Sequence, residues 1–196
     1  MPNVLLPRSW KAALGTRRVP LLLVACLVPA LAACSGAAAH VQLPARRAAS
    51  APVTRATPVV LTSRQRVIAA LAGYVTALGQ AERSRSRAAA RRILRPHLAA
   101  DRVGGLVHAL GAIWARGDAF YGQDVLHVLT VRIHGGRAYV HDCDDTSGMG
   151  LEYAASGQAV PGSAGSAHDN VVTRLELVRG RWQVESQLPE DVRCAP

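Results

Sequence analysis

The densest group of chemically active residue types lies at positions 140–148, which read VHDCDDTSG. Asp142, Asp144 and Thr146 have the i, i+2, i+4 spacing that opens a calcium-binding loop. A complete loop needs glycine at its sixth position and a bidentate glutamate at its twelfth, where this chain has serine and tyrosine. The spacing therefore does not predict a calcium site, and we expect neither a metal nor a cofactor.

The first 33 residues have the layout of a secretory signal peptide, with a basic, acid-free region up to Arg18 and an apolar run over 19–33. This run of about 15 residues is shorter than the roughly 20 that a membrane-spanning helix needs. Residues 31–34, LAAC, resemble the bacterial lipobox, in which the cysteine, here Cys34, is lipidated and becomes the mature N-terminus. The resemblance implies a palmitate-bearing lipoprotein at the outer face of the plasma membrane, where two acyl chains give stable anchoring.

The rest of the chain divides into a linker and one domain. Residues 34–61 carry the lipidated cysteine and are rich in Ala, Pro, Ser and Arg without an apolar period, which is typical of a disordered tether. Residues 62–196 have the patterns of a folded domain. The formal net charge is +10, yet residues 103–196 carry seven Arg against eleven acids. This balance argues against a nucleic-acid-binding domain.

Export also decides the preferred interpretation of Cys143. In an oxidising compartment, the two cysteines that remain after lipidation of Cys34 are expected to form a disulfide, Cys143–Cys194. The competing interpretation is a reactive thiol or a metal ligand. Strand alternation puts His141 on the same face as Cys143, so a base would lie near that thiol.

The elements that position these residues follow from the apolar pattern. Thr62 and Gln65 have capping-box spacing, which predicts a helix over 63–81. A second helix is expected over 87–95. A third begins at an Asp101 cap and ends at Gly117, with apolar residues at i, i+3 and i+4.

Strand patterns follow the helices. Residues 124–134 are apolar on both alternation phases and predict a central strand covered on both faces. Strands are also expected over 137–143, 171–178 and 181–188, with a loop over 154–169 and Asp142, Asp144 and Asp145 in a solvated strand exit. The predicted fold is α+β, with three helices packed on a curved antiparallel sheet of four to five strands.

This element order over residues 63–190, with a last hairpin reading LELVRGRWQVESQ, resembles the nuclear-transport-factor-2-like superfamily. Cystatin-like packing is the alternative. The resemblance implies a cone in which a curved sheet encloses a pocket. In this chain the pocket candidates are Tyr74, His127, Tyr139 and His141, although no family motif assigns a role to them.

The predicted function is a cell-envelope lipoprotein that binds a ligand or a protein and is not an enzyme. We expect a small apolar ligand or an envelope protein as the partner, no nucleic acid, and a homodimer through the sheet face as a further option. Two alternatives remain. One is a small pocket enzyme of the isomerase or hydrolase type. The other is a structural or assembly lipoprotein. The arginines of ERSRSRAAARR fit either an anionic partner or a solvated helix junction.

Overall fold

The computed structural model describes residues 60–195, which contain three helices and six strands. The helices are α2 (Ser63–Ser84), α3 (Arg87–Leu94) and α4 (Ala100–Ala115). The strands are β1 (Asp118–Tyr121), β2 (Val128–His134), β3 (Arg137–Asp144), β4 (Gly150–Tyr153), β5 (Asp169–Val178) and β6 (Arg181–Pro189). Helices packed on antiparallel strands are the predicted α+β class. The predicted signal peptide, Cys34 and nearly all of the tether lie outside the described residues.

Helix α2 begins at the predicted capping box. Thr62 Oγ1 accepts a hydrogen bond from the Gln65 amide at 3.2 Å, and Gln65 Oε1 accepts one from the Thr62 amide at 2.8 Å. The helix continues three residues beyond the predicted end and stops at Arg85, whose φ of 49° is left-handed. No helix within residues 60–195 combines the length and the apolar character that crossing a membrane requires.

The predicted Asp101 cap of α4 is wrong. The residue at the N-cap is Ala99, which makes no side-chain capping bond, and Asp101 lies in the first turn 3.3 Å from the Arg102 guanidinium. The start of α4 is set by tertiary contact instead, because the Ala99 amide donates to the Val184 carbonyl of β6 at 2.8 Å.

Four strands form the main sheet in the order β2-β3-β5-β6, and every neighbouring pair is antiparallel. Strand β2 is therefore an edge strand and not the predicted central one. It begins at Val128. The preceding segment forms an isolated bridge between Val125 and Asp145, and the strand register shifts between Val128 and Thr130. Strands β1 and β4 form a second, two-stranded sheet that the sequence analysis did not predict.

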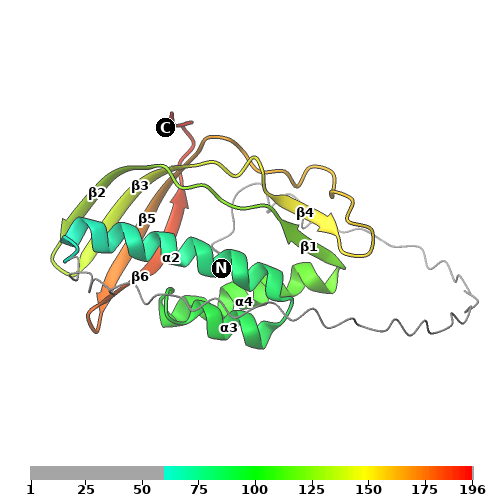
Figure 1. The fold of residues 1–196 in the computed structure, drawn as a ribbon, viewed down its shortest axis with the longest axis horizontal. Helices are drawn as coiled ribbons and strands as arrows, with labels where there is room; N and C mark the ends of the chain where they lie inside the picture. The colour runs from blue at the N-terminus through cyan, green and yellow to red at the C-terminus, as the bar shows by residue number, and fades with distance from the viewer. Residues whose placement is uncertain (1–59, 196) are drawn as a thin grey trace, which may run out of the picture. The chain divides into compact units, whose positions relative to one another are not determined.

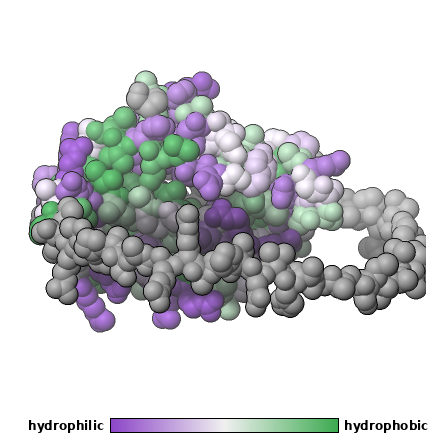
Figure 2. All heavy atoms as spheres, viewed as in Figure 1, coloured by the Kyte–Doolittle hydropathy of each residue, from purple (hydrophilic) through white to green (hydrophobic). Residues whose placement is uncertain are grey.

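The core lies between the helices and the main sheet, which curves over α2 (Figure 1). Its fully buried side chains include Leu71 of α2, Leu110 of α4 and Val140 of β3. Burial of each such side chain contributes about 1.5–3 kcal/mol. Apolar and hydrophilic patches adjoin on the face shown in Figure 2. Burial of Val140 in this core fixes which face of β3 points toward the helices.

Candidate functional site

The inward face of β3 changes from apolar to acidic along the strand. Ala138 and Val140 are fully buried there, and two residues further on Asp142 and Asp144 are 0% and 4% exposed. Because successive side chains of a strand alternate between faces, these four residues point the same way. Two carboxyl groups therefore continue the core-facing row.

This burial overturns the prediction of a solvated strand exit for Asp142 and Asp144. Strand β3 extends to Asp144, which pairs with Asp169 at the start of β5. Only Asp145 behaves as predicted, since its Oδ1 accepts from the Ser147 amide at 3.0 Å in an Asx-type turn. Strand pairing with β5 keeps the first two carboxyls inside.

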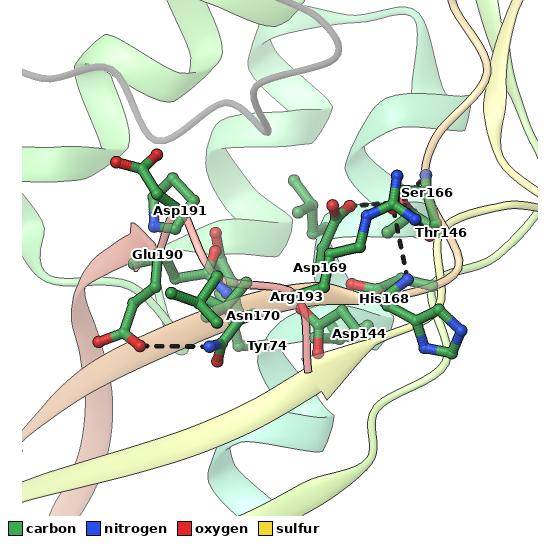
Figure 3. A pocket seen from close by; sticks show the side chains of 17 residues that line it. Tyr74, Asp144, Thr146, Ser166, His168, Asp169, Asn170, Glu190, Asp191 and Arg193 are labelled. Carbon is green, nitrogen blue, oxygen red and sulfur yellow. Dashed lines mark hydrogen bonds between the residues drawn. The ribbon is translucent and has the colours of Figure 1, made fainter. Parts of the chain in front are cut away.

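A cavity of about 210 Å³ opens beside the Asp144 carboxyl. Its walls come from one side of α2, the segment before β2, the ends of β3 and β6, the start of β5 and the chain that follows β6. Figure 3 shows Asp144, Asp169 and Tyr74 gathered at its centre. A second cavity of about 150 Å³ adjoins it through shared residues such as Leu78 and Asp124, and it reaches Glu82. The two cavities form one acidic recess.

Several buried oxygens in the recess walls or on neighbouring residues lack hydrogen-bond partners among the described residues. They are Tyr74 Oη, Glu82 Oε1, Asp124 Oδ1, both Asp142 carboxyl oxygens and Asp144 Oδ1. A buried polar group left unsatisfied costs about 1–3 kcal/mol, more when it is charged. Native proteins satisfy most such groups, so a cluster of orphans calls for a functional explanation.

Burial and mutual repulsion shift these groups toward their neutral forms. Burial and the nearby Asp142 carboxyl raise the pKa of Asp144 to about 9. Burial raises the pKa of Glu82 to about 8, although Arg83 opposes the rise. Burial, followed by Asp124, raises the pKa of Asp142 to about 7.

Asp124 is the electrostatic centre of the recess. Its own pKa rises to about 6 through burial and then through Asp169. Its carboxyl in turn raises the pKa of Asp144, Asp142 and Glu82. The pKa of Tyr74 is also raised, first by burial and then by Glu82.

Glycine backbone and a threonine hydroxyl hold the rim of the recess. Gly122 has φ of 80°, and a Cβ there would lie 2.0 Å from the Gly148 carbonyl, so the turn that leads to Asp124 requires glycine. Thr146 Oγ1 donates to Asp169 Oδ2 at 2.8 Å. Asp169 therefore has a protein partner, whereas Oδ1 of Asp144, its cross-strand neighbour, has none within residues 60–195.

The chain after β6 forms one wall and is tied down at two points. The Glu190 amide donates to the Asn170 carbonyl at 2.8 Å, and Asn170 Nδ2 donates to Glu190 Oε2 at 3.2 Å. Cys143 and Cys194 form the disulfide that the sequence predicts, with their Cα atoms 5.7 Å apart. The competing free-thiol and metal-ligand interpretations of Cys143 do not hold in this arrangement.

Of the four predicted pocket residues, the structure places Tyr74 in the cavity wall. Tyr139 and His141 lie on the opposite face of β3 from Asp142, and neither lines the two cavities. His141 instead contacts Asn170 Oδ1. His127 is exposed before β2 begins, because the strand starts later than predicted.

Sequence reasoning did not consider Asp124 or Asp169, and it placed Asp144 in a solvated strand exit and not in a pocket. The signal that could have found Asp144 is the period of two from Ala138 and Val140, extended through the acids. Nothing local distinguishes Asp124 or Asp169, which reach the recess through the turn at Gly122 and the β3–β5 register.

Comparison with known proteins gives fold likeness only. No protein-family model matches the chain, and no curated protein sequence matches it. The intermembrane space region of the chloroplast protein ARC6 is similar at a TM-score of 0.48 and 11% identity, covering 67% of this chain and 98% of that one.

Two bacterial structures of unknown function are also similar. A cystatin-like fold from Nostoc punctiforme has a TM-score of 0.39 at 10% identity, covering 67% of this chain and 94% of that one. A nuclear-transport-factor-2-like protein from Silicibacter pomeroyi has a TM-score of 0.37 at 15% identity, covering 66% of this chain and 98% of that one. Likenesses at these scores identify neither a family nor a function.

The recess can exchange protons or hold a hydrogen-bond donor. Among residues 60–195, no group of three or more His, Cys, Asp or Glu side chains could hold a metal ion. Carboxyl groups with raised pKa values in a cleft are typical of functional sites.

Proposed function

We propose that the protein is a cell-envelope lipoprotein, anchored through Cys34, whose domain binds a small molecule in the recess without transforming it. The observation that supports binding most directly is the Tyr74 hydroxyl. Tyr74 lines the cavity and its side chain is fully buried. Its hydroxyl has no hydrogen-bond partner in the described part of the chain. Buried tyrosine hydroxyls usually have a partner. A bound molecule would supply it.

The cavity walls also suit a small ligand with an apolar part. Val75 and Leu78 of α2 and Val171 of β5 line the cavity, and Tyr74 and Asp144 add polar groups. Ligand sites commonly combine apolar walls with a few placed polar groups. At about 30 Å³ for each water-sized group, the cavity holds roughly seven non-hydrogen atoms.

Filling the cavity tests the binding function. Val75→Phe places a ring at a position that lines both cavities. We expect native mass spectrometry of the full chain to find a copurifying small molecule, and the variant to lose it. Val60→Phe is the matched control, because Val60 is 90% exposed. An equal amount of bound molecule in both variants would place the ligand elsewhere.

Membrane attachment has its own test. Cys34→Ala removes the proposed site of lipidation, and we expect most of the protein to move from the membrane fraction to the soluble fraction. Cys26→Ala is the matched control, since Cys26 lies within the predicted signal peptide. Continued sedimentation of the Cys34→Ala protein with membranes would contradict the anchor.

A pocket enzyme is the second candidate, and one observation favours it. The pKa values of Asp124, Asp142 and Asp144 are raised to about 6, 7 and 9. Carboxyl groups held at different pKa values can divide the roles of acid and base. Incubation of the identified ligand with the full chain separates the two functions, because an enzyme returns a changed molecule and a binding protein does not.

A further inference from the structure

We infer that the ligand of the recess is a small organic cation, a primary ammonium on a short aliphatic body. This inference rests on the proposed binding function and names the chemical class of its ligand. The ammonium would occupy the polar end of the cavity beside Asp144, Asp124 and Tyr74. The aliphatic body would lie against Val75, Leu78 and Val171.

Charge is the first argument. Five carboxylate side chains line the larger cavity: Asp124, Asp144, Asp169, Glu190 and Asp191. Within the described chain, Arg193 is the one arginine in that lining, and no lysine is present there. An anionic ligand would meet repulsion from most of this wall, whereas a cation would be attracted.

The strand register concentrates negative charge at one point. Asp144 of β3 and Asp169 of β5 are directly paired across the two strands. Like charges opposite each other in a sheet destabilise it. Asp169 is bonded to Thr146, but Asp144 Oδ1 has no partner in the described residues. A cation beside Asp144 would offset its repulsion with Asp169 and would give Asp144 Oδ1 a partner.

Hydrogen bonding is the second argument and does not depend on the acids alone. Tyr74 is fully buried and lines the same cavity. Its hydroxyl, like the carboxyl oxygens, lacks a partner within residues 60–195. An ammonium has three N–H donors and no acceptor. Tyr74, Asp144 and Asp124 all line this cavity, and each has a buried oxygen without a partner among the described residues. Burial and the surrounding acids hold the pKa of Asp144 high in the empty domain, and a bound cation would lower that pKa by stabilising the carboxylate.

Three probes of equal length test the ligand class. Pentylamine, pentanol and pentanoate each fit a space of roughly seven non-hydrogen atoms and differ only in their head group. In titrations of the full chain followed by NMR near pH 7.5, where an alkylamine keeps its proton, we expect pentylamine to bind at least about tenfold more tightly than pentanol. We expect no binding of pentanoate.

The variants place the ammonium. Asp144→Asn keeps the shape of the side chain and removes the carboxyl group that can ionise beside a bound ammonium, and it should weaken pentylamine roughly 10- to 100-fold while pentanol changes by about twofold or less. Asp101→Asn makes the same change at an exposed helix position outside both cavities and should alter neither affinity. Tyr74→Phe should weaken pentylamine by roughly three- to tenfold. Thermal melting of each variant checks that the fold is intact.

Several results would overturn the inference. Pentanol or pentanoate binding as tightly as pentylamine, with the binding lost in Val75→Phe, would refute the ligand class and leave the binding function standing. A shift in melting temperature with calcium chloride and none with pentylamine would show that the ligand is a metal ion and not an organic cation. Unchanged pentylamine affinity in Asp144→Asn would also refute the proposed placement. Failure of all three probes, together with no copurifying molecule, would refute both proposals.

Discussion

Replacing both cysteines, Cys143→Ala with Cys194→Ala, is expected to lower the free energy of unfolding by about 4 kcal/mol. The disulfide closes a loop with a sequence separation of 51, and the chain-entropy model gives this magnitude for a loop of that length. Alanine is the better replacement, because the Cys143 side chain is fully buried and serine would add an unpartnered hydroxyl there. Urea unfolding of the full chain measures the difference from the shift in midpoint.

The reducing agent provides the matched control. Dithiothreitol should bring the wild-type midpoint close to that of the double variant, and it should leave the double variant unchanged. Thiol counting on denatured, unreduced protein should find neither Cys143 nor Cys194 free. A wild-type midpoint that does not respond to reduction would contradict this contribution of the disulfide.

The same bond supports one wall of the recess. Residues 189–193 line the larger cavity and lie between the end of β6 and Cys194. The tail is also joined to β5 through the contacts of Glu190 with Asn170. Stability and ligand affinity should therefore fall together in the double variant.

Local signals in the sequence predicted the helices better than the strands. The capping box at Thr62 and the apolar period of α4 are properties of adjacent residues, so they could be read directly. Strands β1 and β4 have four residues each and pair across about thirty residues of chain. Their pairing depends on tertiary contact. The edge position of β2 was missed for a similar reason, since apolar residues on both phases do not reveal the order of strands.

The candidate site was predictable only in part. Tyr74 belongs to a helical face that the sequence shows, and the disulfide follows from the number of cysteines and the expected compartment. The burial of Asp142 and Asp144 did not follow, because acidic residues after a strand are usually solvated. Their burial results from pairing with β5 and from α2 on the inward side.

The acidic recess leads to the second large effect, an unusual dependence of stability on pH. In the folded domain the pKa of Asp144 is raised to about 9, that of Glu82 to about 8 and that of Asp142 to about 7. In the unfolded chain these groups return to ordinary values of 3.8 for Asp and 4.5 for Glu. Between these limits the folded state holds more protons than the unfolded state.

The sign follows from proton linkage. Stability falls with pH wherever the folded state binds the extra protons, by about 1.4 kcal/mol per pH unit for each retained proton. The stabilising protonation is complete below about pH 4 and is lost as pH rises through about 7 to 9. The charged groups that act on Asp144 are Asp142 of β3, Asp124 and Asp169 of β5. Asp124 also acts on Tyr74 and Glu82 of α2, and Arg83 opposes the shift at Glu82. We expect unfolding free energy to drop by at least about 2 kcal/mol from pH 5 to pH 8.

Asp144→Asn should flatten this profile, because it removes the group with the largest rise in pKa among the acids of the recess. We expect the variant to be about 1–3 kcal/mol more stable than wild type at pH 8 and nearly equal to it at pH 5, measured by urea unfolding at both pH values. Asp101→Asn, at an exposed position, should follow the wild-type profile. Higher wild-type stability at pH 8 than at pH 5, or destabilisation by Asp144→Asn at pH 8, would contradict the linkage. If Asp144 destabilises the empty domain and is also needed for pentylamine binding, then ligand binding explains why a carboxyl group lies at this buried position.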